Sequence, residues 1–311
     1  MTRRVLWSAV MGLVLGLALL AFCAWAARSP GMLAIQPSPT ARATVLPVPT
    51  ATAPPTATAL PTPTPKPPLV AIDPGHGGAD PGGQHYNAQG VLDLTEASVN
   101  LQIALLLRDK LEARGYRVYL TRDTDDFPGE PLQDWNNDGE VTIRDDLQLR
   151  TDRVNEQGAD LFVSLHENAL DGPDPATVRR LGGTTTYYCA DRPFAEQNLR
   201  LATLVHQEIL AAIRSFGYEP ADLGVIDDHQ LETPTGQGQH LYILGPHDAV
   251  ITRPSEMPGC LSEPLFITCE DEAALLAQAD FREALAEAYA NAITAYLEAE
   301  GQPPAAGKAG D

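Results

Sequence analysis

The sequence predicts an α/β fold: a single catalytic domain in which a twisted, largely parallel sheet carries helices on both faces. Three observations predict it. Short apolar runs of strand length alternate with longer segments whose apolar residues recur at helical spacing. The first helical segment closes on Gly115, a residue type that commonly ends helices. Apolar residues make up 44% of the 311 residues, enough to bury a substantial core.

The elements follow one another in a simple alternation. The expected strands are residues 69–72, 117–120, 160–165, 184–188 and 258–262, and the expected helices are residues 95–114, about 143–157, 194–216 and one or two helices within 270–298. In open parallel sheets, ligands bind beyond the carboxyl ends of the strands. The residues that follow the strands are therefore the candidates for function.

Three segments lie outside the domain expected at residues 69–300. Residues 1–28 place arginines before an apolar stretch long enough to cross a bilayer, so they form either a cleaved signal peptide or a transmembrane anchor. Either outcome exports the rest of the chain. Residues 29–68 are rich in Pro, Thr and Ala and are expected to be a disordered linker. Residues 301–311 are expected to be a disordered tail.

Charge and cysteine content exclude some classes of function. A formal net charge of −20 argues against a nucleic-acid-binding protein, which needs a basic surface to meet phosphate. An acidic surface fits a divalent cation or a polar extracellular partner, and it also fits solubility alone. The cysteines lack CxxC spacing, so a cysteine zinc site is not expected. Cys260 and Cys269 either pair in an oxidising compartment or remain buried thiols.

Two histidines and two carboxylates are expected at one rim of the sheet. His76, His166 and Glu263 each follow a predicted strand, and Glu96 opens the first helix just after the loop of His76. Two histidines and one carboxylate form a catalytic zinc set that leaves the fourth position for water. A second carboxylate nearby can take the proton of that water. The other histidines lack comparable context and are given no role: His85, His206, His229, His240 and His247.

A second set of oxygen ligands lies within residues 134–145. Its side chains stand at the ligand positions of an EF-hand-type calcium loop, with Gly139 at the sharp turn and Asp in place of Glu at the last position. The predicted calcium ligands are Asp134, Asn136, Asp138, Glu140 through its carbonyl, and Asp145. The alternative is an acidic surface turn. A bound Ca²⁺ would be structural and would order this insertion in the catalytic domain.

The same residues stand in motifs that resemble a known family. VAIDPGHGG, then Glu96 opening a helix that runs to RGYRVYLTRDTD, resembles the zinc-dependent N-acetylmuramoyl-L-alanine amidases, and so does Arg150 followed by Asn155 and by ADLFVSLHENA. The order and spacing match across the folded part. By this resemblance the zinc ligands are His76, Glu96 and His166, and Glu263 is the catalytic glutamate. The implied substrate is peptidoglycan and the implied location is the cell-wall side of the membrane.

The resemblance has two departures and leaves two alternatives. The family's usual Thr-Gly after the glutamate is Pro264-Leu265 here, and its usual Ala after the second histidine is Glu167. Neither removes a ligand, so they concern loop shape and substrate fit. One alternative is a peptidoglycan-binding module whose active site has lapsed, which predicts loss of a ligand or of the base. The other is a dockerin-like adhesion element, which would carry two calcium loops, whereas the sequence contains one.

Overall fold

The computed structural model describes residues 66–305 except 130, 173, 234–235 and 238. The helices are α1 Glu96–Ala113, α2 Ile143–Gln157, α3 Pro175–Val178, α4 Ala195–Ser215, α5 Glu270–Leu276 and α6 Ala279–Ala299, with a 3₁₀ turn η1 at Asp228–Gln230. The strands are β1 Leu69–Pro74, β2 Gln84–Tyr86, β3 Leu92–Thr95, β4 Arg117–Leu120, β5 Leu161–Leu165, β6 Thr184–Tyr188, β7 Asp222–Asp227, β8 Glu232–Thr233, β9 Gly236–Gln237 and β10 Gly259–Glu263.

Six strands form the main sheet in the order β4-β1-β5-β10-β6-β7. All neighbouring pairs are parallel except β10 and β6, which are antiparallel. The carboxyl ends of β1, β5 and β10 therefore meet at one rim, whereas β6 and β7 end at the opposite rim. The prediction of a largely parallel sheet is confirmed.

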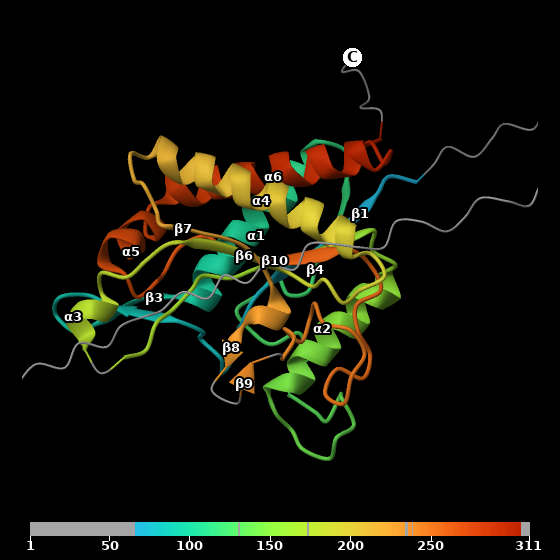
Figure 1. Cartoon of the computed structure of the whole chain (residues 1–311), viewed down its shortest axis with the longest axis horizontal. Helices are drawn as coiled ribbons and strands as arrows, with labels where there is room; N and C mark the ends of the chain where they lie inside the picture. The colour runs from blue at the N-terminus through green and yellow to red at the C-terminus, as the bar shows by residue number, and fades with distance from the viewer. Residues whose placement is uncertain (1–65, 130, 173, 234–235, 238, 306–311) are drawn as a thin grey trace, which may run out of the picture. The chain divides into compact units, whose positions relative to one another are not determined.

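Both faces of the sheet are covered, as Figure 1 shows with α4 and α6 on one side and α2 on the other. Successive side chains of a strand point to opposite faces, and in β1 both sets are buried. Val70 and Ile72 join the larger core, which includes side chains of α1, α4 and α6. Leu69 and Ala71 join the smaller core, to which Val154 of α2 belongs. The prediction of helices on both faces is confirmed.

Local caps explain why the two helices next to the site begin where they do. Thr95 precedes α1, and its hydroxyl accepts a hydrogen bond from the amide of Ser98 at 3.3 Å. Thr142 precedes α2 and forms a reciprocal capping box with Asp145. Gly158 ends α2 in the left-handed conformation with φ of 61°, which glycine adopts without strain.

The sequence-based elements match the structure closely, and the terminal helical stretch is divided into α5 and α6. The prediction missed β7 and the hairpin of β2 and β3. β7 lies at the edge of the sheet with its side chains exposed or half-buried, and Gly224 interrupts its apolar pattern. An edge strand without a buried face gives no alternation to detect.

Several sequence-based expectations concern residues beyond those described here. The expected signal peptide or anchor at 1–28 and most of the linker lie outside the described residues, as do residues 306–311. Between Lys66 and Ala305, leaving out the gaps given above, no helix has the length and apolar character needed to cross a membrane. Cys260 and Cys269 are both buried free thiols, so they do not pair.

Candidate active site

His76 lies in the tight turn that follows β1. Its φ is 64°, a left-handed conformation that few residues other than glycine adopt. The turn is held from two sides, because Arg122 and Arg150 donate hydrogen bonds to the carbonyl of Pro74 at 2.9 Å each. Arg150 also donates to the carbonyl of His76 at 2.7 Å. Strain of this kind persists where the surroundings over-determine the backbone, as they do here.

Glu96 is the first residue of α1 and points back over the loop that precedes it. Its backbone amide donates to the carbonyl of Gly83 at 2.9 Å, and the amide of Gly83 donates to Oε2 of Glu96 at 2.7 Å. This reciprocal pair fixes one carboxylate oxygen and leaves Oε1 to face the histidines. The carboxylate is almost fully buried, with 5% of its side chain exposed.

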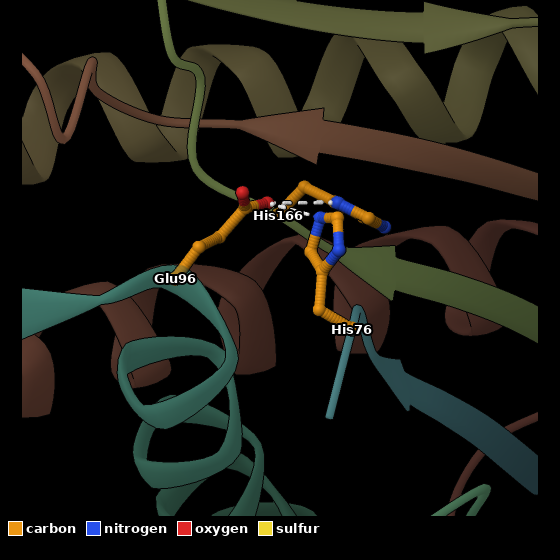
Figure 2. Close-up of side chains that lie close together, drawn as sticks. All are labelled: His76, Glu96 and His166. Atoms are coloured by element: carbon orange, nitrogen blue, oxygen red, sulfur yellow. Dashed lines mark hydrogen bonds and ion pairs between the residues drawn. The ribbon is translucent and has the colours of Figure 1, made fainter. Parts of the chain in front are cut away.

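The carboxylate of Glu96 lies between the two histidines, as Figure 2 shows. Oε1 of Glu96 is 3.0 Å from Nε2 of His76 and 2.9 Å from Nδ1 of His166. The two imidazole rings meet edge to face with their centroids 4.8 Å apart. His76, Glu96 and His166 form a group whose ligand atoms all lie within 4.8 Å of one another and could hold a metal ion.

Two glycines allow the backbone to approach these side chains closely. A Cβ at Gly75 would lie 2.3 Å from Cε1 of His166, and one at Gly82 would lie 2.6 Å from Oε2 of Glu96. Both distances are far below van der Waals contact. Any other residue at these positions would displace a histidine or the carboxylate, so the local shape of the site requires glycine.

Charge pairing dominates the electrostatics of the cluster. Burial acts to lower the pKa of His76, but hydrogen bonds to Asp80 and Glu96 outweigh it and raise the pKa to about 10. Burial acts to raise the pKa of Glu96, but His166 and His76 outweigh it and bring that pKa far below its ordinary value. Nδ1 of His76 lies 2.8 Å from Asp80, which leaves Nε2 directed at Glu96.

A buried ion-pair network of Arg150, Asp73 and Asp146 supports the turn that carries His76. Arg150 bonds Asp73 through Nη1 at 2.8 Å and Asp146 through Nε at 2.6 Å, and each of these side chains is 1% exposed. Burial acts to raise the pKa of Asp73, but Arg150 and the hydroxyls of Thr121 and Ser164 bring it down to about 2. Burial raises the pKa of Asp146 to about 6. Asp73 is the better-satisfied carboxylate, because one oxygen of Asp146 is buried without a partner.

Glu263 is the last residue of β10, next to the strand that delivers His166. It is partly buried, and burial together with the charge of Glu96 raises its pKa to about 8. Its loop is tied to the His166 loop by Glu167, whose Oε2 accepts the amide of Leu265 at 3.1 Å. The amide of Glu167 donates to Oε1 of Glu96 at 3.0 Å. Burial raises the pKa of Glu167 well above its ordinary value.

A pocket opens from the histidines along the face of the sheet that α2 covers. Its floor includes Leu261, and its lining includes both histidines and Arg150. One wall is the first half of α2, with Ile143, Asp146 and Leu147, and the other wall is the segment 241–243. The pocket gives the cluster an approach from this side.

The predicted calcium ligands lie together in a turn before α2. The amides of Asp138 and Gly139 donate to the two carboxylate oxygens of Asp134 at 3.1 Å each. Asp145 accepts from the amides of Asn136 at 3.0 Å and Thr142 at 2.7 Å. Within the described part of the chain, the groups of His, Cys, Asp and Glu that could hold a metal do not include these carboxylates.

The structure thus brings His76, Glu96 and His166 together, with Glu263 at the end of the neighbouring strand β10, and it adds partners that the sequence analysis did not identify. Asp80 orients His76, and Asp73 with Asp146 holds Arg150. Asp80 could have been noticed as a carboxylate four residues after a proposed ligand. Asp146 could have been noticed as a carboxylate four residues before Arg150 on a predicted helix. Asp73 gave no separate signal, because it meets Arg150 across 77 residues of sequence.

Comparisons with known proteins point to one family. The sequence pattern of the N-acetylmuramoyl-L-alanine amidase family matches residues 70–295. The germination-specific N-acetylmuramoyl-L-alanine amidase of Bacillus subtilis is 25% identical over 237 residues, which cover 76% of this chain and 82% of that protein. The amidase AmiC of Neisseria meningitidis is 26% identical, over 74% of this chain and 53% of that protein.

A solved structure shows the same architecture. The N-acetylmuramoyl-L-alanine amidase AmiC2 of Nostoc punctiforme matches with a TM-score of 0.50 and 28% identity, covering 74% of this chain and 97% of that one. The family match spans more than half of the chain and includes both histidines, Glu96 and Glu263. The chain therefore belongs to the N-acetylmuramoyl-L-alanine amidase family of enzymes.

Proposed function

We propose that this enzyme hydrolyses the amide bond between N-acetylmuramic acid and L-alanine in peptidoglycan, with Zn²⁺ bound by His76, Glu96 and His166. The observation that carries the proposal is the meeting of two imidazoles and one carboxylate at the rim where three parallel strands end. Membership of the amidase family indicates which bond is cleaved.

The three side chains fit zinc in type and in spacing. Two nitrogens and one oxygen form a usual catalytic set with room for water. Ligand atoms at zinc distance in a tetrahedral site are roughly 3.3 Å apart. The observed separations of 3.0 and 2.9 Å from Glu96 to the histidines need only a small outward shift. Asp80 beside His76 is the usual outer carboxylate that fixes the tautomer of a ligating histidine.

Glu263 is proposed as the general base and then the general acid. A zinc ion held by His76, Glu96 and His166 would supply Lewis-acid chemistry, polarising the lactyl carbonyl and lowering the pKa of the attacking water. Glu263 takes a proton from the attacking water and delivers it to the departing nitrogen of L-alanine. Its pKa of about 8 means that the ionised carboxylate binds a proton more strongly than that of an ordinary glutamate.

The alternative of a lapsed wall-binding module is less well supported. A lapsed site predicts replacement of at least one ligand or of the base. All four residues are retained, and the supporting contacts of Asp80, Arg150 and Glu167 are formed around them. Activity is therefore the better reading of this geometry.

The proposed location is the cell-wall side of the cytoplasmic membrane. Peptidoglycan is assembled outside that membrane, and residues 1–28 have the composition of an export signal or anchor. The partners are peptidoglycan and, if the segment is retained, the membrane. The net charge of −20 supports the absence of nucleic acid among the partners.

We further propose that residues 134–145 bind a structural Ca²⁺. The register of oxygen ligands supports it, and Gly139 has the positive φ of 90° that the sixth loop position needs. The loop amides donate to Asp134 and Asp145, so the two carboxylates are held toward the loop interior. Asp145 also caps α2, so a bound ion would fix the start of the helix that carries Arg150.

The test measures zinc content and product release together. The purified enzyme should contain zinc and release peptides with a free L-alanine amino terminus from peptidoglycan. Glu263→Gln should retain zinc and lose activity by at least about 10²-fold, the usual scale for a general base. Glu256→Gln, the same change at an exposed position, is the control and should remain active. Zinc-free enzyme with full activity would contradict the metal assignment, and activity of Glu263→Gln near the control would contradict the base.

A further inference from the structure

A second cluster of metal-binding side chains lies at the opposite rim of the sheet. Because β6 is antiparallel to β10, Thr185 pairs with Glu263 at the active-site rim and the end of β6 points away from it. Asp191 lies in the turn after β6. His229 lies in η1 directly after β7, and His240 follows in the segment that returns toward the sheet.

The three side chains converge on one exposed point. Oδ2 of Asp191 is 3.6 Å from Nε2 of His240 and 3.9 Å from Nδ1 of His229. The imidazole rings have centroids 5.3 Å apart. The three ligand atoms all lie within 4.8 Å of one another. Asp191 and His229 have 61% and 55% of their side chains exposed, so an ion can reach the point from solvent.

A buried carboxylate orients His240 in the manner of a metal ligand. Asp228 has no exposed side-chain surface, and its Oδ1 lies 2.9 Å from Nδ1 of His240. With the proton on Nδ1, the lone pair of Nε2 is directed toward Asp191. Oδ2 of Asp228 accepts the amide of Leu241 at 3.0 Å, so the carboxylate itself is fixed. Ligating histidines commonly donate their other nitrogen to a carboxylate in this way.

We propose that Asp191, His229 and His240 bind a divalent transition-metal ion such as Zn²⁺ at a site separate from the active site. Two imidazoles and a carboxylate favour zinc and the other late first-row transition metals over magnesium or calcium. The ion would join the turn after β6 to the segment that continues into residues 241–243, which line the active-site pocket. Its role is therefore to hold one wall of that pocket in place. The inference does not depend on the amidase reaction.

The competing arrangement uses the buried side of the same histidine. Cys189, Asp228 and His240 also form a group within 4.8 Å, with Sγ of Cys189 3.5 Å from Nδ1 of His240. A metal there needs Nδ1 of His240, which already bonds Asp228 at 2.9 Å. The exposed set is the one with free ligand atoms in position.

Metal titration of the purified, metal-free chain distinguishes these arrangements. Co²⁺ binding is followed by visible absorption and elemental analysis. The wild type should bind Co²⁺ at two sites, whereas His166→Ala should bind it only at the site of Asp191, His229 and His240. Asp191→Ala and His229→Ala should each weaken the second site by at least about 10-fold, since outer-shell changes alone cost that much. Both residues are largely exposed, so the far-UV circular dichroism spectrum of each variant should stay near that of the wild type. His247→Ala, an exposed histidine outside the cluster, is the matched control and should bind as the wild type does.

Three results would overturn the proposal. One is a wild type that binds a single equivalent. Another is Asp191→Ala and His229→Ala binding as much Co²⁺ as His247→Ala. The third is a thiolate-to-cobalt charge-transfer band that disappears in Cys189→Ser, which would place the ion on the buried set.

Discussion

Arg150→Met removes the charge that two buried carboxylates share and keeps much of the side-chain volume. The fall in the pKa of Asp73 from 3.8 to about 2 corresponds to about 2 kcal/mol of favourable interaction in the folded state. The carbonyls of Pro74 and His76 also lose donors. Breaking a buried pair from one side typically costs about 3–5 kcal/mol. We expect the free energy of unfolding to fall by that amount at neutral pH.

The pH dependence of the loss gives the sharper test. In the wild type the depressed pKa of Asp73 contributes stability above about pH 4, and that stability is lost as the pH falls toward 2. Without Arg150 the buried carboxyl takes up a proton more readily, so its pKa rises above the ordinary value and the variant loses stability as the pH rises. The gap between the two proteins should therefore widen from about pH 3 to pH 7.

Urea unfolding followed by circular dichroism measures the gap at each pH. Arg153→Met is the matched control on the same helix, because Arg153 is half-buried and donates one hydrogen bond, to the carbonyl of Pro128 at 2.7 Å. Its loss should be about 0.5–1.5 kcal/mol with little dependence on pH. A loss for Arg150→Met no larger than this, or a gap that shrinks as the pH rises, would refute the reasoning.

The remaining predictions concern the two metals and Glu167, which links the loop after His166 to the loop after Glu263. His166→Ala should lose the zinc bound at the active site and the activity with it; stoichiometric zinc there with full activity would show that His166 is not a ligand. Ca²⁺ should raise the melting temperature of the zinc-loaded wild type but not of Asp134→Ala/Asp138→Ala, because an ion that binds only the folded state stabilises it. An unchanged melting temperature of the wild type would show that residues 134–145 are an acidic turn and not a calcium site. Glu167→Gln should fold almost as stably as the wild type, because the amide oxygen of glutamine can still accept the hydrogen bond from the amide of Leu265. Glu167→Ala should lose about 1–3 kcal/mol in urea unfolding, because that amide is left unpaired; equal losses would contradict this role of the hydrogen bond.

The sequence was sufficient for the parts of the site that depend on periodicity and topology. Strand ends place His76, His166 and Glu263, and a helix start places Glu96, so parallel packing brings them to one rim. Contacts between distant segments could not be predicted. The pairing of Arg150 with Asp73 depends on how α2 lies across the sheet, and no local pattern encodes that angle.

The second cluster was missed for a related reason. β7 is an exposed edge strand, so the segment before the last strand was read as polar loop and its histidines had no expected location. Once β7 is placed beside β6, Asp191 and His229 come from the same end of neighbouring strands. The sequence contained the ligand types but not the strand that aligns them.

The glycines around the active-site cluster restrict access to it from one side. The backbone at Gly75 and Gly82 lies so close to His166 and Glu96 that no space for a substrate remains on that side. The open approach is the pocket between α2 and residues 241–243. Under the proposed function, the substrate would reach the histidines through this pocket. Changes at Ile143, Leu147 or residues 241–243 would then alter which substrates fit while leaving the proposed zinc ligands in place. The residues that line the pocket walls and the proposed zinc ligands lie on different segments of this chain, so substrate selectivity and reactivity can change independently.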